Sequence, residues 1–130
     1  MHRKKHQTDW APLSTNSSPD DEQHDMTDRL ATMRQLAARQ PDNPLARFGL
    51  ANELLKAKLY AEAEVELAAY LARHDDEGNG WLRYADVLRT LERTADASVA
   101  ITRGIAAARR FQHATLVNEL EALADEIADQ

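Results

Sequence analysis

The sequence contains no cysteine, which excludes a disulfide framework, a thiol nucleophile and a thiolate zinc site. Glycine and proline are scarce, with four residues of each among 130, and aromatic residues make up only 5%. Apolar residues still account for 43% of the chain, which is enough for one core if alanine and leucine carry most of the packing. Because strong helix formers dominate and helix breakers are rare, the composition predicts a single all-α domain.

Positive charge is also in short supply. The chain has 16 Lys and Arg against 22 Asp and Glu, a net charge of −6. A nucleic-acid-binding protein gathers an excess of Lys and Arg on one face, so we expect no nucleic-acid partner. The sequence also shows neither an apolar run long enough for a membrane span nor a secretory signal. We therefore expect no membrane partner and a cytoplasmic protein.

Sequence patterns for catalysis are missing as well. There is no glycine-rich phosphate loop, no G-x-S-x-G nucleophile motif and no pair of carboxylates on a predicted apolar cleft. The histidines do not fall at metal-ligand spacing within predicted structure; they are His2, His6, His24, His74 and His113. We expect no enzyme activity, no cofactor and no metal site.

Residues 1–25 are rich in Ser, Asn, Asp and Gln and have almost no periodic apolar residues. Such a segment cannot bury enough apolar surface to offset the entropy of ordering, so it is predicted to be a disordered tail. Trp10 is the exception, because an isolated large aromatic residue is a typical anchor for docking. Docking of the Trp10 segment on a groove and an incidental tryptophan both remain open.

What the sequence does contain is a repeated pattern from Pro44 onward. Ala51 and Leu54 recur as Ala85 and Leu88, at an offset of 34 residues. The same offset relates two further pairs, Ala63 with Ala97 and Leu71 with Ile105. A period of 34 residues is typical of repeats in which each unit is one pair of antiparallel helices.

The pattern divides residues 26–130 into four parts that together predict about six helices. A half repeat spans 26–41, full repeats span 44–77 and 78–111, and a C-terminal capping helix spans 114–128. Asn43 can cap the helix that starts at Pro44, and Asp76 or Asn79 can cap the first helix of the second repeat. Residues 114–130 carry five acids and no Lys or Arg. We expect these acids to lie near the bases of the preceding helix, which are Arg103, Arg109 and Arg110.

The second copy reads Trp81-x2-Tyr84-Ala85-x2-Leu88, followed by Ala97-x3-Ile101. This resembles the tetratricopeptide repeat (TPR), and the chain is similar to small bacterial proteins with few such repeats. The resemblance implies a right-handed α-solenoid of antiparallel helix hairpins. The first copy departs from the pattern, with Arg47 in place of the usual aromatic residue. Lys58 and Glu92 stand where a glycine is common in the tight turn between helices.

The resemblance also implies a concave groove, lined by the first helix of each hairpin, that binds a peptide. Residues at the family's peptide-contacting positions are Leu45, Phe48, Gly49, Asn52, Leu55 and Lys56 in the first hairpin, and Asn79, Leu82, Arg83, Asp86, Arg89 and Thr90 in the second. Cations at Lys56, Arg83 and Arg89 around an apolar floor favour a peptide with an acidic group beside a large apolar residue. The alternative is that Phe48 and Leu55 only pack against neighbouring helices.

Three functions are compatible with this pattern. The first is a non-catalytic scaffold that binds another protein or a peptide in the groove. The second is a structural subunit that self-associates, for example as a homodimer, through the outer face of the helix over 26–39, which has no helix before it. The third is a regulatory subunit of an enzyme.

Overall fold

The computed structural model describes residues 19–129. Within this range the chain forms helices and no strand, so the predicted all-α class is confirmed for the part described. The helices are α2 (Pro19–Arg39), α3 (Pro44–Lys56), α4 (Tyr60–Arg73), α5 (Asn79–Thr90), α6 (Thr94–Arg110) and α7 (Ala114–Ala128). The predicted tail over residues 1–18, including Trp10, lies outside the described residues.

Helix α2 is longer than the sequence pattern predicted. It begins at Pro19, so residues 19–25 are helical, and the prediction that they belong to a tail is wrong. A proline fits the first position of a helix because its fixed φ is helical and its missing N–H has no partner there in any case. Acidic residues directly after that proline are a further signal of a helix start, and this signal outweighs the lack of apolar periodicity.

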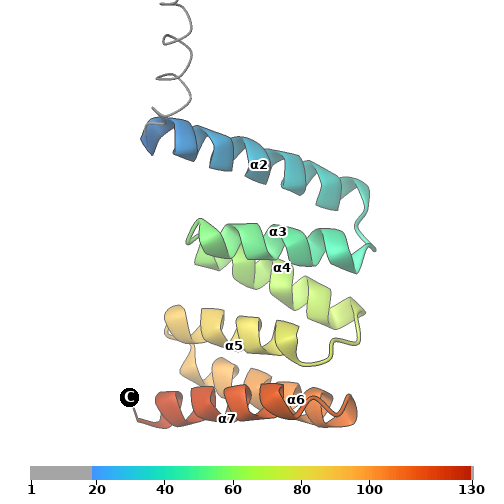
Figure 1. The fold of residues 1–130 in the computed structure, drawn as a ribbon, viewed down its shortest axis with the longest axis vertical. Helices are drawn as coiled ribbons and strands as arrows, with labels where there is room; N and C mark the ends of the chain where they lie inside the picture. The colour runs from blue at the N-terminus through green and yellow to red at the C-terminus, as the bar shows by residue number, and fades with distance from the viewer. Residues whose placement is uncertain (1–18, 130) are drawn as a thin grey trace, which may run out of the picture.

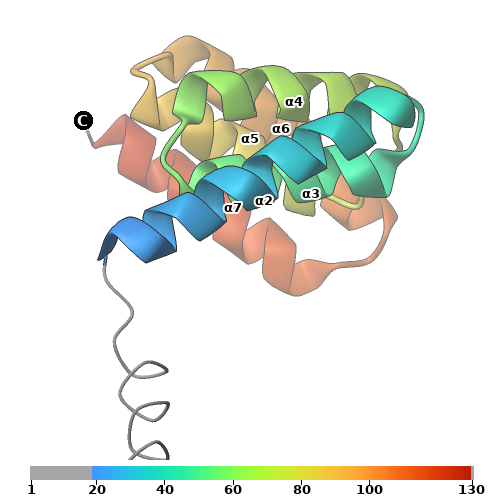
Figure 2. The ribbon, with the colours of Figure 1, turned by 90° about the horizontal axis from the view of Figure 1, so that it is seen from above.

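The helices stack in chain order, as Figures 1 and 2 show from two directions. Each helix contacts the next one along the chain, and α7 also contacts α5. In Figure 1, α3, α5 and α7 lie in front, α4 and α6 lie behind them, and α2 lies at the top of the stack. The front helices therefore share one face of the molecule.

Alanines occupy fully buried positions on the helices α3, α4, α5 and α6. Ala51, Ala63, Ala85 and Ala97, which recur at the 34-residue offset, are all 0% exposed. Small side chains let two helix axes approach closely, and larger residues then fill the space on either side. The largest fully buried side chains are Leu54, Leu67, Leu88 and Leu120.

Three helices end in a left-handed turn that is built without glycine. Lys58 and Glu92 each have a φ of 62°, and Gln112 has a φ of 58°. After each of them, the next amide donates to a carbonyl five residues earlier, which closes the helix end in a Schellman motif. These bonds run from Leu59 to Leu54 at 2.9 Å, from Arg93 to Leu88 at 2.8 Å and from His113 to Ala108 at 2.7 Å. The tight turns thus form despite the absence of glycine.

Asp76 fixes the connection between α4 and α5. Its side chain is buried, with the residue only 5% exposed. One carboxylate oxygen accepts hydrogen bonds from the amides of Gly78 at 2.8 Å and Gly80 at 2.7 Å, and the other accepts one from the Tyr70 hydroxyl at 2.7 Å. Burial, together with this bond to a carboxylate, raises the pKa of Tyr70. Of the two predicted caps, Asp76 therefore fills the role, and Asn79 is the first residue of α5.

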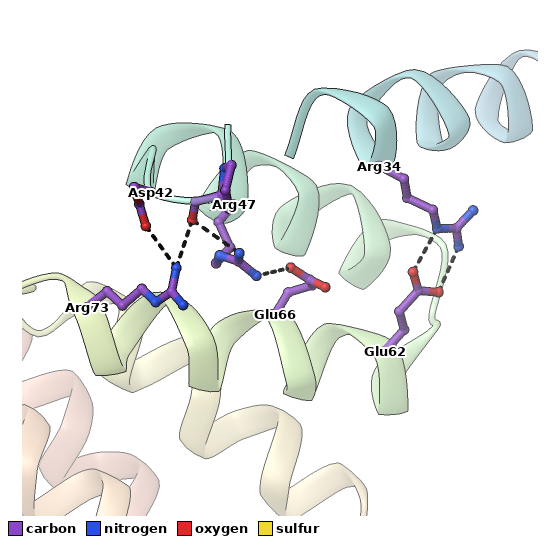
Figure 3. A network of polar contacts seen from close by, with 7 residues as sticks. Arg34, Asp42, Arg47, Glu62, Glu66 and Arg73 are labelled. Carbon is purple, nitrogen blue, oxygen red and sulfur yellow. Dashed lines mark hydrogen bonds and ion pairs between the residues drawn. The ribbon is translucent and has the colours of Figure 1, made fainter. Parts of the chain in front are cut away.

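A polar network ties α2, α3 and α4 together (Figure 3). Arg34 of α2 makes two bonds of 2.7 Å to Glu62 of α4, and Arg47 of α3 donates to Glu66 of α4 at 2.9 Å. Arg47 also donates to the Pro41 carbonyl, so it joins α4 to the turn before α3. Arg47, which the sequence pattern singled out as a departure from the usual aromatic residue, thus makes polar contacts with both neighbouring segments.

Candidate functional site

Two open pockets lie on the face formed by α3, α5 and α7. The first, which we call the α3–α5 pocket, has a volume of about 570 Å³. The second, the α5–α7 pocket, has a volume of about 430 Å³. Arg83 lines both, so the two pockets adjoin at this residue, and we call the two together the groove. The α3–α5 pocket is lined by Met33, Gly49, Asn52, Glu53, Leu55, Lys56 and Arg83. The α5–α7 pocket is lined by Leu82, Arg83, Asp86, Arg89, Glu119, Ala122, Leu123 and Glu126.

Helical spacing brings these side chains to one face. On α3, Asn52 and Lys56 are four residues apart and so project from the same side, while Ala51 and Leu54 project into the core. On α5, Leu82, Asp86 and Arg89 follow the same three-and-four spacing. The burial of the core stripe therefore determines which residues of α3 and α5 face the groove.

The structure places most of the predicted groove residues in the two pockets. Asn52, Leu55 and Lys56 line the α3–α5 pocket, and Leu82, Asp86 and Arg89 line the α5–α7 pocket with Arg83 between them. Four predicted residues line neither pocket: Leu45, Phe48, Asn79 and Thr90. Leu45 is 80% exposed at the start of α3, and Asn79 is half-buried at the start of α5.

Phe48 is a structural residue in this arrangement. It is half-buried against the core cluster of Ala51, Leu67 and Val87, and its ring lies 4.8 Å from the ring of Tyr70, centroid to centroid. Leu55 also packs against core residues, but it still lines the α3–α5 pocket. The alternative that Phe48 packs on neighbouring helices thus describes its position, and the predicted apolar floor is formed by Leu55 and Leu82.

Helix α7 supplies a wall that the sequence pattern did not predict. Glu119, Ala122, Leu123 and Glu126 line the α5–α7 pocket. The expected pairing with α6 holds for Arg109, which lies 3.7 Å from Glu121, whereas Arg110 pairs with Asp75. The guanidinium of Arg103 instead lies 5.9 Å from the centre of the Trp81 ring. The acidic composition of the last helix was a visible signal, but its contact with α5 does not follow from the 34-residue period.

Most of the bases in the groove are neutralised by acids beside them. Lys56 lies 3.1 Å from Glu53, which also binds Arg29 at 3.1 Å. The hydrogen bonds from Lys56 and Arg29 lower the pKa of Glu53, so that carboxylate stays ionised at neutral pH. Arg89 pairs with Asp86 at 2.7 Å and with Glu126 at 3.6 Å. These bases are therefore already engaged within the protein.

Arg83 differs from the other bases. Its guanidinium carbon lies 5.7 Å from the centre of the Phe48 ring, a distance typical of a cation–π contact. Among the side chains that the structure describes, no carboxylate pairs with Arg83. Its buried Nε has no hydrogen-bond partner, which is also true of Arg89, but the guanidinium of Arg89 is paired with Asp86. Phe48 thus holds a guanidinium with free donors at the junction of the two pockets.

Residues 19–129 contain neither a candidate metal-binding cluster nor a candidate membrane-spanning helix. In this part of the chain, no three His, Asp or Glu side chains come together in a group that could hold a metal ion. Nor does any helix described there combine the length and the apolar character that a bilayer span requires.

Comparisons with protein-family models, with curated proteins and with solved structures find no match to this chain. The resemblance to the TPR therefore rests on the residue pattern given above.

Proposed function

We propose that this chain is a non-catalytic scaffold of the cytoplasm, built as a right-handed TPR-like solenoid, that binds a peptide segment of another protein. Two features support the repeat. The second helices of the two hairpins start at Tyr60 and Thr94, which are 34 residues apart, and the alanines at this same offset are fully buried. Stacked hairpins of this kind present a concave face to a ligand.

The observation that carries the proposal is the position of Arg83. An arginine presents several donors in a planar fork that matches a carboxylate. Here the fork borders both pockets and has no acidic partner among the described side chains. A ligand carboxylate would complete its hydrogen bonds, and such a charge-assisted bond contributes roughly 1.5–3 kcal/mol.

Apolar residues on either side of Arg83 define the rest of the ligand. Leu55 lies in the α3–α5 pocket, and Leu82 and Leu123 lie in the α5–α7 pocket. In a peptide with an acidic residue directly beside a large apolar residue, the acid would accept the hydrogen bonds of Arg83 while the apolar side chain is buried in one of the two pockets. This is the ligand chemistry that the sequence predicted.

Peptide selection tests this proposal. We expect the intact protein to enrich, from a random peptide library, sequences in which Asp or Glu neighbours a large apolar residue. Arg83→Glu should weaken binding of the enriched peptides by about 10- to 100-fold, which is the loss of one charge-assisted bond expressed as a dissociation constant. The measurement is fluorescence anisotropy with the selected peptides.

Arg39→Glu is the matched control, because it makes the same charge change at an exposed residue that lines neither pocket. It should leave peptide affinity unchanged. Equal loss in the two variants would mean that net charge alone attracts the peptide. An enriched set without acids would contradict the proposed role of Arg83.

Self-association through α2 is the alternative function, and the described part of that helix offers it little apolar surface. Between Met26 and Arg39, Leu36 is the one large apolar side chain that is exposed, at 41%. Stable homodimers usually bury an interface that is larger and more apolar than a surface with one exposed leucine. We therefore expect static light scattering to give the mass of one chain at all concentrations. A mass that rises to that of two chains, and returns to one chain in Leu36→Lys, would support the alternative instead.

A further inference from the structure

We propose that, in the absence of a partner, the groove is occupied by the chain's own residues 3–10. In this arrangement Asp9 binds Arg83, Trp10 fills the α3–α5 pocket, and the bases Arg3, Lys4 and Lys5 lie against the acidic wall of the α5–α7 pocket. The inference rests on the same groove as the proposed function. Residues 3–10 would compete with the partner for the groove.

The chemistry of Asp9 and Trp10 matches the groove. They are adjacent in the sequence, so they present an acidic group directly beside a large apolar residue. Arg83 has free donors at the junction of the pockets, and the neighbouring pocket has room for an indole ring beside Leu55. The chain therefore carries, in its own first residues, the kind of ligand that its groove fits.

Charge complementarity sets the direction of the segment. The α5–α7 pocket is lined by three acids, Asp86, Glu119 and Glu126, against two bases, Arg83 and Arg89, and α7 contains no Lys or Arg. With Arg83 bound to Asp9, the acids of this pocket exceed its remaining base, Arg89, although Glu126 and Asp86 both pair with Arg89. Residues 3–5 are three consecutive bases, Arg-Lys-Lys. If Trp10 lies in the α3–α5 pocket, the bases continue towards α7. Trp10 then contacts apolar residues at one end of the groove, and the three bases contact acids at the other end.

The length of the segment is sufficient for this path. Nine Cα-to-Cα steps lead from Trp10 to Pro19, and an extended chain of that length reaches about 30 Å. The α3–α5 pocket includes Met33 of α2, which lies about 21 Å along the helix from Pro19. The step from that pocket to α7 crosses about one or two helix spacings of 8–10 Å. Residues 3–5 lie about 17–23 Å of extended chain beyond Trp10, which spans that step.

Fluorine NMR of the full chain labelled with 5-fluorotryptophan tests the proposal. The chain has two tryptophans, Trp10 and Trp81, so Trp10→Phe assigns the two signals. The shift of each signal between H2O and D2O reports the exposure of that indole ring to solvent. We expect the Trp10 shift to be less than half that of free 5-fluorotryptophan and independent of protein concentration.

Variants at the proposed ion pair sharpen the test. Asp9→Lys and Arg83→Glu should each return the Trp10 shift to nearly that of free 5-fluorotryptophan. The double variant Asp9→Lys/Arg83→Glu exchanges the two charges, so it should again shield Trp10 from solvent. Arg39→Glu should change nothing. Because Asp9 lies outside residues 19–129, which form the described helices, Asp9→Lys keeps the test valid even if Arg83→Glu disturbs folding.

Several results would overturn the proposal. One is a Trp10 signal that is fully exposed in the unaltered chain, and another is protection that ignores both Asp9→Lys and Arg83→Glu. Protection that grows with concentration as a dimer appears would assign the segment to the groove of a second copy. That outcome contradicts occupation by the same chain.

The failure of this inference can be told apart from failure of the proposed function. The selected peptide should bind several-fold more tightly to Asp9→Asn/Trp10→Ala than to the unaltered chain, because the internal competitor is weakened. Equal binding with an exposed Trp10 would refute the inference and leave the scaffold function standing. If Trp10 is shielded in the unaltered chain but Asp9→Asn/Trp10→Ala binds no peptide, only the scaffold function would be refuted.

Discussion

Replacing Asp76 by alanine is expected to lower the free energy of unfolding by about 3–5 kcal/mol. The carboxylate accepts hydrogen bonds from Tyr70, Gly78 and Gly80 in a buried position, and bonds to a charged group contribute roughly 1.5–3 kcal/mol each. Water that enters the vacated space would recover part of the loss. Since small domains are stable by only about 5–15 kcal/mol, this loss would be a large fraction of the molecule's stability. Urea denaturation followed by circular dichroism measures the change.

Two neighbouring substitutions serve as controls for Asp76. Tyr70→Phe removes one of the three donors and should cost about 1–3 kcal/mol. Asp75→Ala removes an adjacent but exposed carboxylate that pairs with Arg110, so it should cost less than about 1 kcal/mol. If Asp75→Ala and Asp76→Ala were equally destabilising, the effect would come from net charge, and the buried cap would not explain it.

The glycines in two helices should respond to alanine with opposite signs. Gly104 is buried in α6, and a Cβ there would lie 2.7 Å from the Cβ of Trp81 and 3.1 Å from the Leu120 side chain. Because the Trp81 Cβ is fixed to its backbone, α5 and α6 must move apart. We expect Gly104→Ala to cost about 1–3 kcal/mol by overpacking, although alanine favours helix.

Gly49 of α3 is the matched comparison. A Cβ there would meet only the terminal methyl group of Met33, at 3.1 Å, and that group can rotate away. Gly49→Ala should therefore raise the free energy of unfolding by about 0.5–1 kcal/mol through helix propensity. Urea denaturation of both variants gives the two signs. A stabilising Gly104→Ala would show that α5 and α6 do not cross as closely as the structure indicates.

The helical core could be predicted from the sequence because it depends on local spacing. Ala51 and Ala85 recur at one offset among larger apolar residues, and only a helix places those residues on a single stripe. Helix ends were predictable where a side chain acts on its own backbone. Asn43 accepts a hydrogen bond from the Leu45 amide at 3.0 Å, as a capping residue should.

The groove was less predictable because it depends on contacts between distant segments. Glu126 faces Arg89 across the α5–α7 pocket, a contact set by how α7 packs on α5 and not by any motif within either helix. Phe48 illustrates the same limit. Its position in the repeat predicted that it lines the groove, but its ring packs against Tyr70 and lies near the guanidinium of Arg83. The distinctive state of Arg83 needed the positions of all its neighbours.

The stability of this protein could be increased at three turns, those at Lys58, Glu92 and Gln112. A residue with a side chain in the left-handed conformation costs about 1 kcal/mol or more, and glycine avoids that cost. All three residues lie outside the two pockets. A more durable version of the molecule could therefore be made by relaxing its backbone at these corners, with the recognition surface left as it is.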